Sequence, residues 1–285
     1  MDYLNLGCGR RFHPEWINAD RFPADPRVMQ LDITRGIPYP DDTFGVVYHS
    51  HLLEHLPRSS GKVFISECAR VLRPGGVLRV VVPDLEAIVG LYMSTLQAAL
   101  SGMPGASDDY HWMMLELYDQ AVRRVPGGEM LRYLRRDPLP NEQFIIRRFG
   151  QEALNLIEAA GRERTLALGR TERSLPRTNA LRKSLAAAKR LLCHPKETLL
   201  RVALGSDYSA LEFGRFCWSG ELHQWMYDRF SLRLLFEQCG LVNVAQRTAS
   251  ESGIPGWSTY SLDAQPDGAV HKPDSLFMEG TKTWR

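Results

Sequence analysis

Short apolar runs alternate with a helical pattern over the first 90 residues. Four runs are short enough for strands that are buried on both faces, at 3–7, 28–32, 45–50 and 77–83. Before the last run, "SGKVFISECARVL" at 60–72 repeats its apolar residues at helical spacing, and "RPGG" at 73–76 ends the helix. This alternation predicts an α/β fold with a mostly parallel sheet, whose ligand lies beyond the carboxyl ends of the strands.

The pattern changes in the middle of the chain. No strand signal occurs from about 91 to 219, where the segments 154–170 and 179–192 look helical. The α/β pattern then resumes with a helix at 228–240 and strands near 242–248 and 275–281. We therefore expect a sheet domain made of residues 1–90 and 220–285. The helical insertion at 91–219 is expected to contribute to binding of the substrate.

Charge separates the same regions. The chain has a net charge of +2, yet the stretch from Arg123 to Arg201 holds 18 Lys and Arg against 8 Asp and Glu. Solvated faces of amphipathic helices account for this excess of basic residues. The alternatives are binding of an anionic substrate and docking on an anionic membrane surface. Nucleic acid is disfavoured, because the basic residues are not interleaved with aromatic side chains that stack on bases.

Composition points to a globular protein of a reducing compartment. The sequence is 44% hydrophobic and 24% charged, and no apolar run approaches the roughly 20 residues of a membrane span. No signal peptide precedes the first strand. The five cysteines have no paired spacing, and their odd number argues against a disulfide framework. A cytoplasmic location is the expectation.

A glycine-rich turn follows the first apolar run. In "YLNLGCGRRFHPEWINAD" at 3–20, Gly7 and Gly9 match the start of the dinucleotide fingerprint, but Phe12 stands where its third glycine belongs. The acid of the fingerprint comes about 20 residues after the glycines, whereas Asp20 follows Gly7 by 13 positions. The turn therefore predicts a nucleoside ligand without a pyrophosphate.

The order of motifs resembles class I S-adenosylmethionine-dependent methyltransferases. "LNLGCG", "LDI", "FGVVYHSHLLEHL" and "ECARVLRPGGVLRVVVPD" follow one another at the family's separations, and "HQWMYDRFSLRLLFEQCGL" and "KPDSLFMEG" resemble the family's tail. The resemblance covers roughly residues 2–90 and 220–282, and is nearest to a type 11-like branch associated with glycan or natural-product modification. It implies a Rossmann-like sheet, mostly parallel with an antiparallel last strand, and S-adenosylmethionine as cofactor.

The resemblance also implies which residues bind the cofactor. Gly7 and Gly9 let the backbone approach the methionine portion, and Asp20 accepts hydrogen bonds from both ribose hydroxyls. Asp32 and Ile33 would contact the adenine; the alternatives are a strand end or cap for Asp20 and a turn for Asp32. The full implied set is Asn5, Gly7, Cys8, Gly9, Asp20, Asp32, Ile33, His49 and Leu53, with the backbone at His49 lining the methionine side. The short link from Gly9 to Asp20 leaves little room for the family's usual first helix.

Transfer of a methyl group to a hydroxyl requires a base. His51, just beyond the strand at 45–50, is the first candidate, because a histidine titrates near neutral pH. His223 is the second, with a buried structural histidine as the alternative. Asp84 is the third; it either orients a sugar hydroxyl or caps the helix that follows it. In the resembling families, His55 and its neighbour Glu54 are mainly structural.

The remaining sequence features concern a metal ion and the molecule that accepts the methyl group. Asp108, Asp109 and His111 could hold a divalent ion, but adjacent acids diverge in most conformations, so no metal is expected. By resemblance, the acceptor is a sugar, a glycan or another small hydroxylated molecule, and the aromatic residues of "FCWSGELHQWMYDRF" suit packing against a sugar or the cofactor. Methylation at nitrogen or carbon, a non-catalytic scaffold and a nicotinamide oxidoreductase remain as alternatives.

Overall fold

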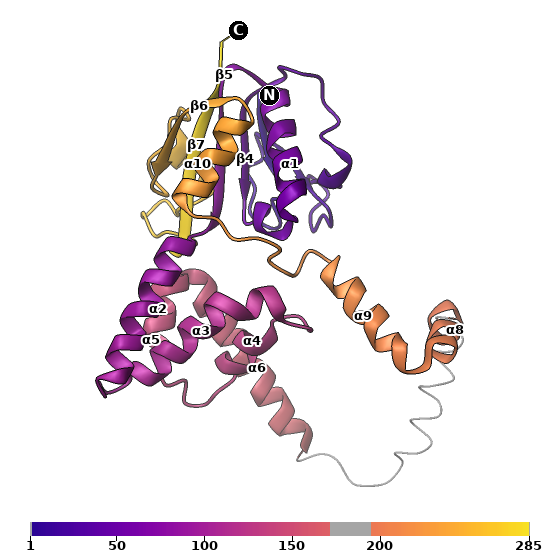
Figure 1. Cartoon of the computed structure of the whole chain (residues 1–285), viewed down its shortest axis with the longest axis vertical. Coiled ribbons are helices and arrows are strands. Elements are labelled where there is room, and N and C mark those ends of the chain that lie inside the picture. Colours follow the sequence, from indigo (N-terminus) through magenta and orange to yellow (C-terminus); the bar gives the residue numbers. More distant parts are fainter. Residues whose placement is uncertain (1, 172–194, 285) are drawn as a thin grey trace.

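One mixed sheet organises the chain. The computed structural model describes residues 2–171 and 195–284. Seven strands form the sheet in the order β3-β2-β1-β4-β5-β7-β6, with β7 antiparallel to both of its neighbours and the other pairs parallel (Figure 1). The strands are β1 (Tyr3–Leu6), β2 (Ile17–Asp20), β3 (Met29–Gln30), β4 (Phe44–Ser50), β5 (Leu72–Pro83), β6 (Leu241–Arg247) and β7 (Ser275–Lys282). The Rossmann-like sheet with an antiparallel last strand is confirmed.

The longest strand begins earlier than the apolar run predicts. Helix α1 (Arg58–Val71) passes directly into β5 at Leu72. The "RPGG" segment then forms an irregularity in the strand, because Leu72 pairs with Phe44 whereas Val77 pairs with Val46. Gly75 takes a φ of 77° there, a conformation that glycine adopts without steric cost. The segment thus acts as a bulge within β5.

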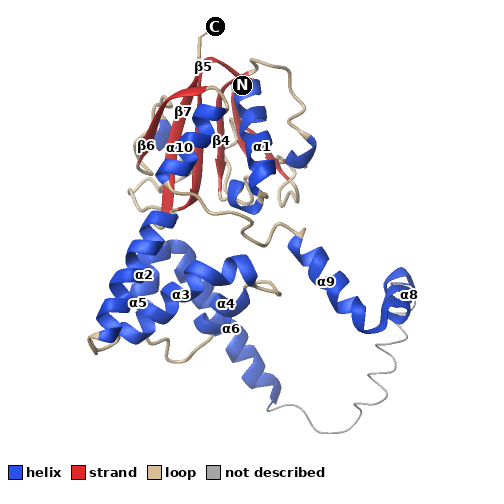
Figure 2. Cartoon of the chain, viewed as in Figure 1, coloured by secondary structure: helices blue, strands red, loops and turns tan. Residues whose placement is uncertain are grey.

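Two helices cover one face of the sheet. α1 and α10 (Arg229–Gln238) lie side by side over it (Figures 1 and 2). Asp228 and Ser231 cap the start of α10 reciprocally through side chain and backbone. The core beneath the helices contains Leu4, Leu6, Val47, Phe64, Ile65, Leu78, Leu232 and Phe236, all buried. This packing fixes the carboxyl ends of β1 and β4 against one another.

The opposite face is covered by the connection between β6 and β7. Its Trp257, within the short 3-10 helix Trp257–Tyr260, packs against Tyr48 of β4 and Trp16. Beside this aromatic cluster, the guanidinium of Arg79 is fully buried, with its centre 4.4 Å from the centroid of a Trp257 ring. The connection therefore takes the place of a helical layer on this face.

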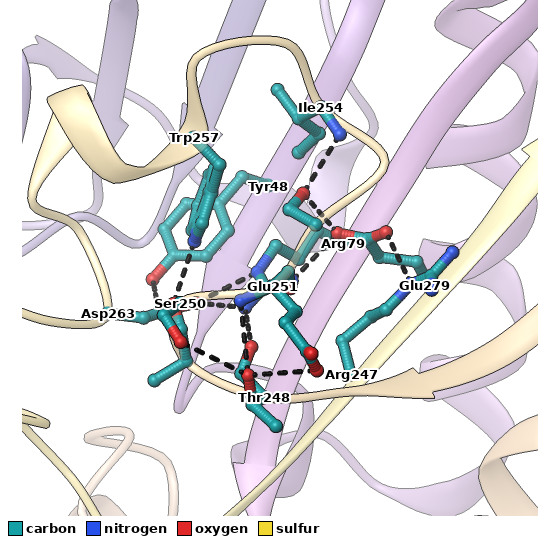
Figure 3. Close-up of polar contacts among 12 residues, drawn as sticks. Tyr48, Arg79, Arg247, Thr248, Ser250, Glu251, Ile254, Trp257, Asp263 and Glu279 are labelled. Atoms are coloured by element: carbon teal, nitrogen blue, oxygen red, sulfur yellow. Dashed lines mark hydrogen bonds and ion pairs between the residues drawn. The ribbon is translucent and has the colours of Figure 1, made fainter.

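Arg79 is held by a network of charged and polar groups (Figure 3). Its Nε donates to Asp263 Oδ2 at 2.8 Å, and its Nη1 donates to Glu279 Oε1 at 2.7 Å. Backbone carbonyls of Thr248 and Glu251 accept from Nη2 and Nη1 at 2.8 and 3.0 Å. Tyr48 donates to the other oxygen of Asp263 at 2.6 Å. These bonds attach the connection to the central strands.

A helical region follows β5. Helices α2 to α6 form their own core around Ile88, Trp112, Met113, Tyr133 and Ile145, below the sheet in Figure 1. The expected domain boundary at residue 90 falls within α2 (Leu85–Leu100). Ile88, which precedes that boundary, already packs in the helical core. The helices are α2 (Leu85–Leu100), α3 (Ala106–Val122), α4 (Gly128–Leu134), α5 (Glu142–Phe149), α6 (Gln151–Thr171), α8 (Pro195–Leu204) and α9 (Tyr208–Cys217). The predicted helix at 179–192 lies outside the described residues.

The helical region leaves and re-enters the sheet at one point. The last residue before α2, Asp84, forms a parallel bridge with Tyr227, which precedes α10. The backbone N–H of Leu85 donates to the carbonyl of Tyr227 at 3.1 Å. The two ends of the insertion are therefore hydrogen-bonded neighbours.

The described helices and cysteines bear on membrane insertion and on disulfides. Among the helices of the described residues, none is long and apolar enough to cross a bilayer. Cys8, Cys68, Cys217 and Cys239 are free thiols, and Cys193 lies outside the described part of the chain.

Candidate functional site

A cavity of about 420 Å³, the donor cavity, opens at the carboxyl edge of the sheet. It lies at the carboxyl ends of β1, β2 and β4, the edge at which open α/β sheets bind ligands. Residues at or just beyond the carboxyl ends of four different strands line it: Gly7, Asp20, Asp32 and His51. Ile33, Leu52, Trp218 and Gln224 complete much of the wall.

The link between β1 and β2 is short and contains no helix, as predicted. Gly7 has a φ of 64°, and a Cβ there would lie 2.9 Å from the side chain of Leu52. The backbone N–H groups of Gly9 and Phe22 donate to the two carboxylate oxygens of Asp20, each at 2.8 Å. Asp20 is thereby held at the cavity wall with lone pairs remaining for a ligand hydroxyl.

Asp32 and Ile33 lie together on the same wall. The Asp32 carboxylate accepts from the Thr34 hydroxyl at 2.6 Å and from the Thr34 backbone N–H at 3.1 Å. These hydrogen bonds, the hydroxyl first, lower the pKa of Asp32, so the group is an anionic acceptor at neutral pH. An acceptor beside an apolar side chain is an arrangement that suits the edge and face of a purine.

Four residues of the implied cofactor set lie behind the cavity wall. Asn5 is buried and donates to Asn18 Oδ1 at 3.2 Å. Cys8 is buried, as a space-filling residue would be. Leu53 lies in the core, and its neighbour Leu52 lines the cavity instead. The ring of His49 is fully buried against Phe64, so only its backbone is near the edge of the sheet.

A second cavity of about 350 Å³, the acceptor-side cavity, lies between the sheet edge and the helical region. Trp112, Met130 and Phe149 supply apolar surface, and Gln120 and Glu152 supply polar groups. His51 and His55 line both cavities. The two cavities therefore meet at these histidines.

The positive charges of the acceptor-side cavity are each paired with an acid. Arg123 Nη2 lies 3.4 Å from Glu221 Oε2, and it also donates to the Glu221 carbonyl. Lys272 Nζ lies 3.4 Å from Glu152 Oε2. All four residues line the cavity. The pairing leaves little net charge for an anionic acceptor and offers both donors and acceptors to a neutral polar one.

His51 is positioned through both ring nitrogens. Its Nδ1 lies 3.1 Å from Glu54 Oε1, and its Nε2 lies 2.9 Å from the hydroxyl of Ser275. Glu54 is completely buried. A carboxylate at Nδ1 favours the tautomer whose lone pair is on Nε2, which is the nitrogen a base requires. No local sequence pattern indicates Ser275 as a partner of His51, since the two residues are 224 positions apart.

His223 lies against His55 at the same wall. The two rings meet edge to face, with centroids 4.9 Å apart. Burial lowers the pKa of His223 to about 3, so its ring is neutral at pH 7. Burial alone would raise the pKa of Glu54, but the hydrogen bond and charge of His51, followed by the charges of His55 and His223, bring it to about 2. The group combines a buried anion with polarisable imidazoles.

The remaining candidates have local roles in the structure. The Asp84 carboxylate accepts from the backbone N–H groups of Glu86 and Ala87, and so caps α2. It is not among the residues that line the two cavities. On α3, Asp109 accepts from Asn141, and the ring of His111 lies near that of Tyr133. Within the described residues, Asp108, Asp109 and His111 do not form a group of converging metal ligands.

Comparison with known proteins agrees with the sheet and its edge. Residues 4–80 match the family described as "Methyltransferase domain". A curated probable S-adenosylmethionine-dependent methyltransferase of Mycolicibacterium smegmatis is 42% identical over 100 residues. The match covers 29% of this chain and 38% of that relative, so it concerns one part of each protein. Both findings support S-adenosylmethionine as the cofactor of this domain.

Solved methyltransferases resemble the chain more distantly. One is a putative methyltransferase of Haloferax volcanii in complex with the Trm112 methyltransferase activator. It is 10% identical to this chain, the similarity covers 99% of this chain and 83% of that chain, and the TM-score is 0.38. Another, from Archaeoglobus fulgidus, has 19% identity, 32% and 50% coverage and a TM-score of 0.27. At such scores these likenesses add no argument to the strand order.

His49 in β4 makes stability dependent on pH. Burial lowers its pKa to about 3, with Glu54 acting in the opposite direction, so below the ordinary value of 6.5 the unfolded chain binds a proton that the folded protein excludes. The free energy of unfolding should fall by up to about 1.4 kcal/mol per pH unit between pH 6.5 and 3 from this group. Urea denaturation of wild type and His49→Leu across this range measures the difference.

His49→Leu should show a smaller slope, and it also removes two buried ring nitrogens that have no hydrogen-bond partner. His111→Leu, at an exposed position on α3, is the matched control and should keep the wild-type slope. Equal slopes for His49→Leu and wild type would contradict the assignment.

Proposed function

We propose that the protein is an S-adenosylmethionine-dependent O-methyltransferase that acts on a neutral hydroxylated molecule such as a sugar or a glycan. The observation that carries the proposal is the meeting of two cavities at His51 and His55. Methyl transfer needs a donor and an acceptor aligned on either side of a short gap. A histidine shared by both cavities stands at that gap.

The donor cavity fits the cofactor by the chemistry of its wall. Gly7 allows close approach of the backbone, Asp20 offers oxygens to ribose hydroxyls, and Asp32 with Ile33 offers an acceptor and an apolar contact to adenine. When bound, S-adenosylmethionine supplies a methyl group activated by its sulfonium. Trp218, at the end of α9, adds an aromatic surface from the helical region.

The acceptor-side cavity favours a neutral polar acceptor. Its cations Arg123 and Lys272 are paired with acids, which weakens the case for an anionic acceptor. Gln120, Glu152 and Glu221 offer hydrogen-bond partners, and Trp112 offers an apolar ring. Sugar rings present this combination of hydroxyl groups and apolar C–H faces. The helical insertion thus contributes the acceptor wall.

His51 is the proposed base. Nε2 receives the proton of the acceptor hydroxyl as its oxygen bonds to the methyl carbon, and the Glu54 carboxylate, with Oε1 3.1 Å from Nδ1, stabilises the positive charge that His51 gains. Ser275, which contacts Nε2, either yields its place to the acceptor hydroxyl or relays the proton. Methylation of nitrogen or carbon is the second candidate; the carboxylate-oriented histidine favours oxygen, since an amine needs no such base.

Calorimetric titration with S-adenosylhomocysteine tests the donor cavity. Wild type should bind it, and Asp20→Asn should bind about 10–100-fold more weakly, because a hydrogen bond to a charged group contributes about 1.5–3 kcal/mol. Asp25→Asn is the matched control, since Asp25 lies on the β2–β3 loop and pairs with Arg27 at 2.8 Å. It should bind as wild type does.

Titration with NAD separates the rival functions. Binding of NAD without S-adenosylhomocysteine would replace the proposal by a nicotinamide oxidoreductase. Binding of neither ligand would favour a scaffold that keeps the fold alone.

A further inference from the structure

Three potential metal ligands converge beside the shared histidines. Glu54, His55 and His223 each offer one ligand atom, and these atoms all lie within 4.8 Å of one another. They come from two segments far apart in the sequence: the 3-10 helix Leu53–His55 after β4, and the connection from α9 to α10. We propose that Glu54, His55 and His223 form a binding site for a divalent transition-metal ion, with zinc as the best match.

The carboxylate of Glu54 carries the argument furthest. It is 0% exposed, and neither oxygen accepts a hydrogen bond of good geometry, although Oε1 lies 3.1 Å from Nδ1 of His51. Buried charged groups are paired or coordinate metals. Oε1 faces His51, which leaves Oε2 for an ion. One carboxylate can thus serve the histidine and the metal together.

The imidazole of His55 is oriented as in known metal sites. Its Nδ1 lies 3.0 Å from the carbonyl of Leu222, so Nδ1–H donates and the lone pair is on Nε2. Metal-bound histidines almost always donate their other N–H to a carbonyl, a carboxylate or water. The ring of His223 lies edge to face against it, with centroids 4.9 Å apart.

The backbone fixes the two segments against each other. The N–H groups of Gln224 and Trp225 donate to the carbonyl of Glu54 at 2.6 and 3.2 Å. The N–H of His223 donates to the carbonyl of Gln120 on α3 at 3.0 Å. A tetrahedral ion with bonds of about 2.0–2.1 Å needs donors about 3.3 Å apart, so the side chains would close by up to about 1.5 Å.

The ligand set indicates the metal and its coordination. Two imidazole nitrogens and one carboxylate are the protein ligands of several catalytic zinc sites, in which a further position stays open. The charge of Arg123, which acts on His223, is balanced by Glu221. His55 and His223 both line the acceptor-side cavity, so an open position would face it. There the ion would lower the pKa of an acceptor hydroxyl; this role rests on the proposed function, whereas binding of the ion does not.

Cobalt(II) titration of the full chain tests the site. Protein treated with a chelator is titrated with Co²⁺ in the absence of any methyl donor. We expect one equivalent to bind, with visible ligand-field absorption that added Zn²⁺ abolishes. His223→Gln should weaken binding by about 100-fold or more, since even the partners of ligands contribute 10–100-fold. Glu54→Gln, which keeps the side-chain shape, should do the same, with circular dichroism verifying that each variant is folded.

His111→Gln is the matched control, because this exposed histidine lies beside the two acids of the alternative α3 site. It should leave Co²⁺ binding unchanged. Failure of wild type to bind Co²⁺ or Zn²⁺, or undiminished binding in a folded His223→Gln, would overturn the site, as would loss of binding in His111→Gln. Calorimetry with S-adenosylhomocysteine on metal-free protein reports separately on the proposed function.

Discussion

Arg79→Ala is expected to lower the free energy of unfolding by about 3–5 kcal/mol, the cost of breaking a buried ion pair by removal of one partner. Arg79 is fully buried, and it donates to Asp263, Glu279 and two backbone carbonyls. Without the guanidinium, Asp263 loses the cation paired with it, and Glu279 keeps one of its two arginine partners, Arg247. Chemical denaturation followed by tryptophan fluorescence measures the loss, with Trp257 reporting on this side of the sheet.

Arg247→Ala provides the matched control. Arg247 also pairs with Glu279, at 3.2 Å, but its side chain is 40% exposed. Exposed pairs contribute about 0–1 kcal/mol, so this variant should unfold almost as wild type does. Equal losses in both variants would mean that burial of Arg79 does not set the cost. A loss of under about 1 kcal/mol in Arg79→Ala would contradict the structural role of the network.

His51→Gln is expected to reduce the turnover number by about 100-fold or more, once an acceptor is known. Glutamine retains a polar side chain but cannot take up a proton. The affinity for S-adenosylhomocysteine should change little, because Asp20 and Asp32 supply the polar contacts of the donor cavity. Steady-state kinetics and calorimetry together separate the two effects.

Ser275→Ala tests how His51 delivers its effect. If the acceptor hydroxyl replaces Ser275 at Nε2, this variant should keep most of its turnover, whereas a proton relay through Ser275 would make it nearly as slow as His51→Gln. Turnover of His51→Gln within about tenfold of wild type would exclude His51 as the base and favour methylation at nitrogen or carbon.

Much of the sheet could be predicted because its signals are local. The apolar runs ending at Leu6 and Ser50 are short and mostly hydrophobic, and Gly7 directly follows the first of them. The layer over the opposite face could not be predicted. It depends on Arg79 meeting Asp263 and Glu279, which are 184 and 200 positions away, and no periodicity encodes such a pairing.

The candidate site divides in the same way. Gly7 and Asp32 end two of the predicted strands, so the parallel arrangement alone brings them to one edge. Strand alternation would put the side chains of His49 and His51 on the same face of the sheet. The left-handed φ of 51° at His51 breaks this alternation, so only the structure separates the buried ring of His49 from the ring of His51 at the cavity. Trp218 reaches the donor cavity, and Ser275 reaches His51, through tertiary folding alone.

The adjacency of Asp84 and Tyr227 affects how the chain folds and varies. Because the two ends of the insertion are hydrogen-bonded neighbours, folding closes the insertion into a loop. Each doubling of a loop's length adds only about 0.6 kcal/mol to the entropic cost of closing it. Helices α2 to α6 also have a core of their own. The insertion can therefore lengthen, shorten or be exchanged with little effect on pairing of β5 with β7. On the proposed function, one donor domain can thus be combined with many acceptor walls.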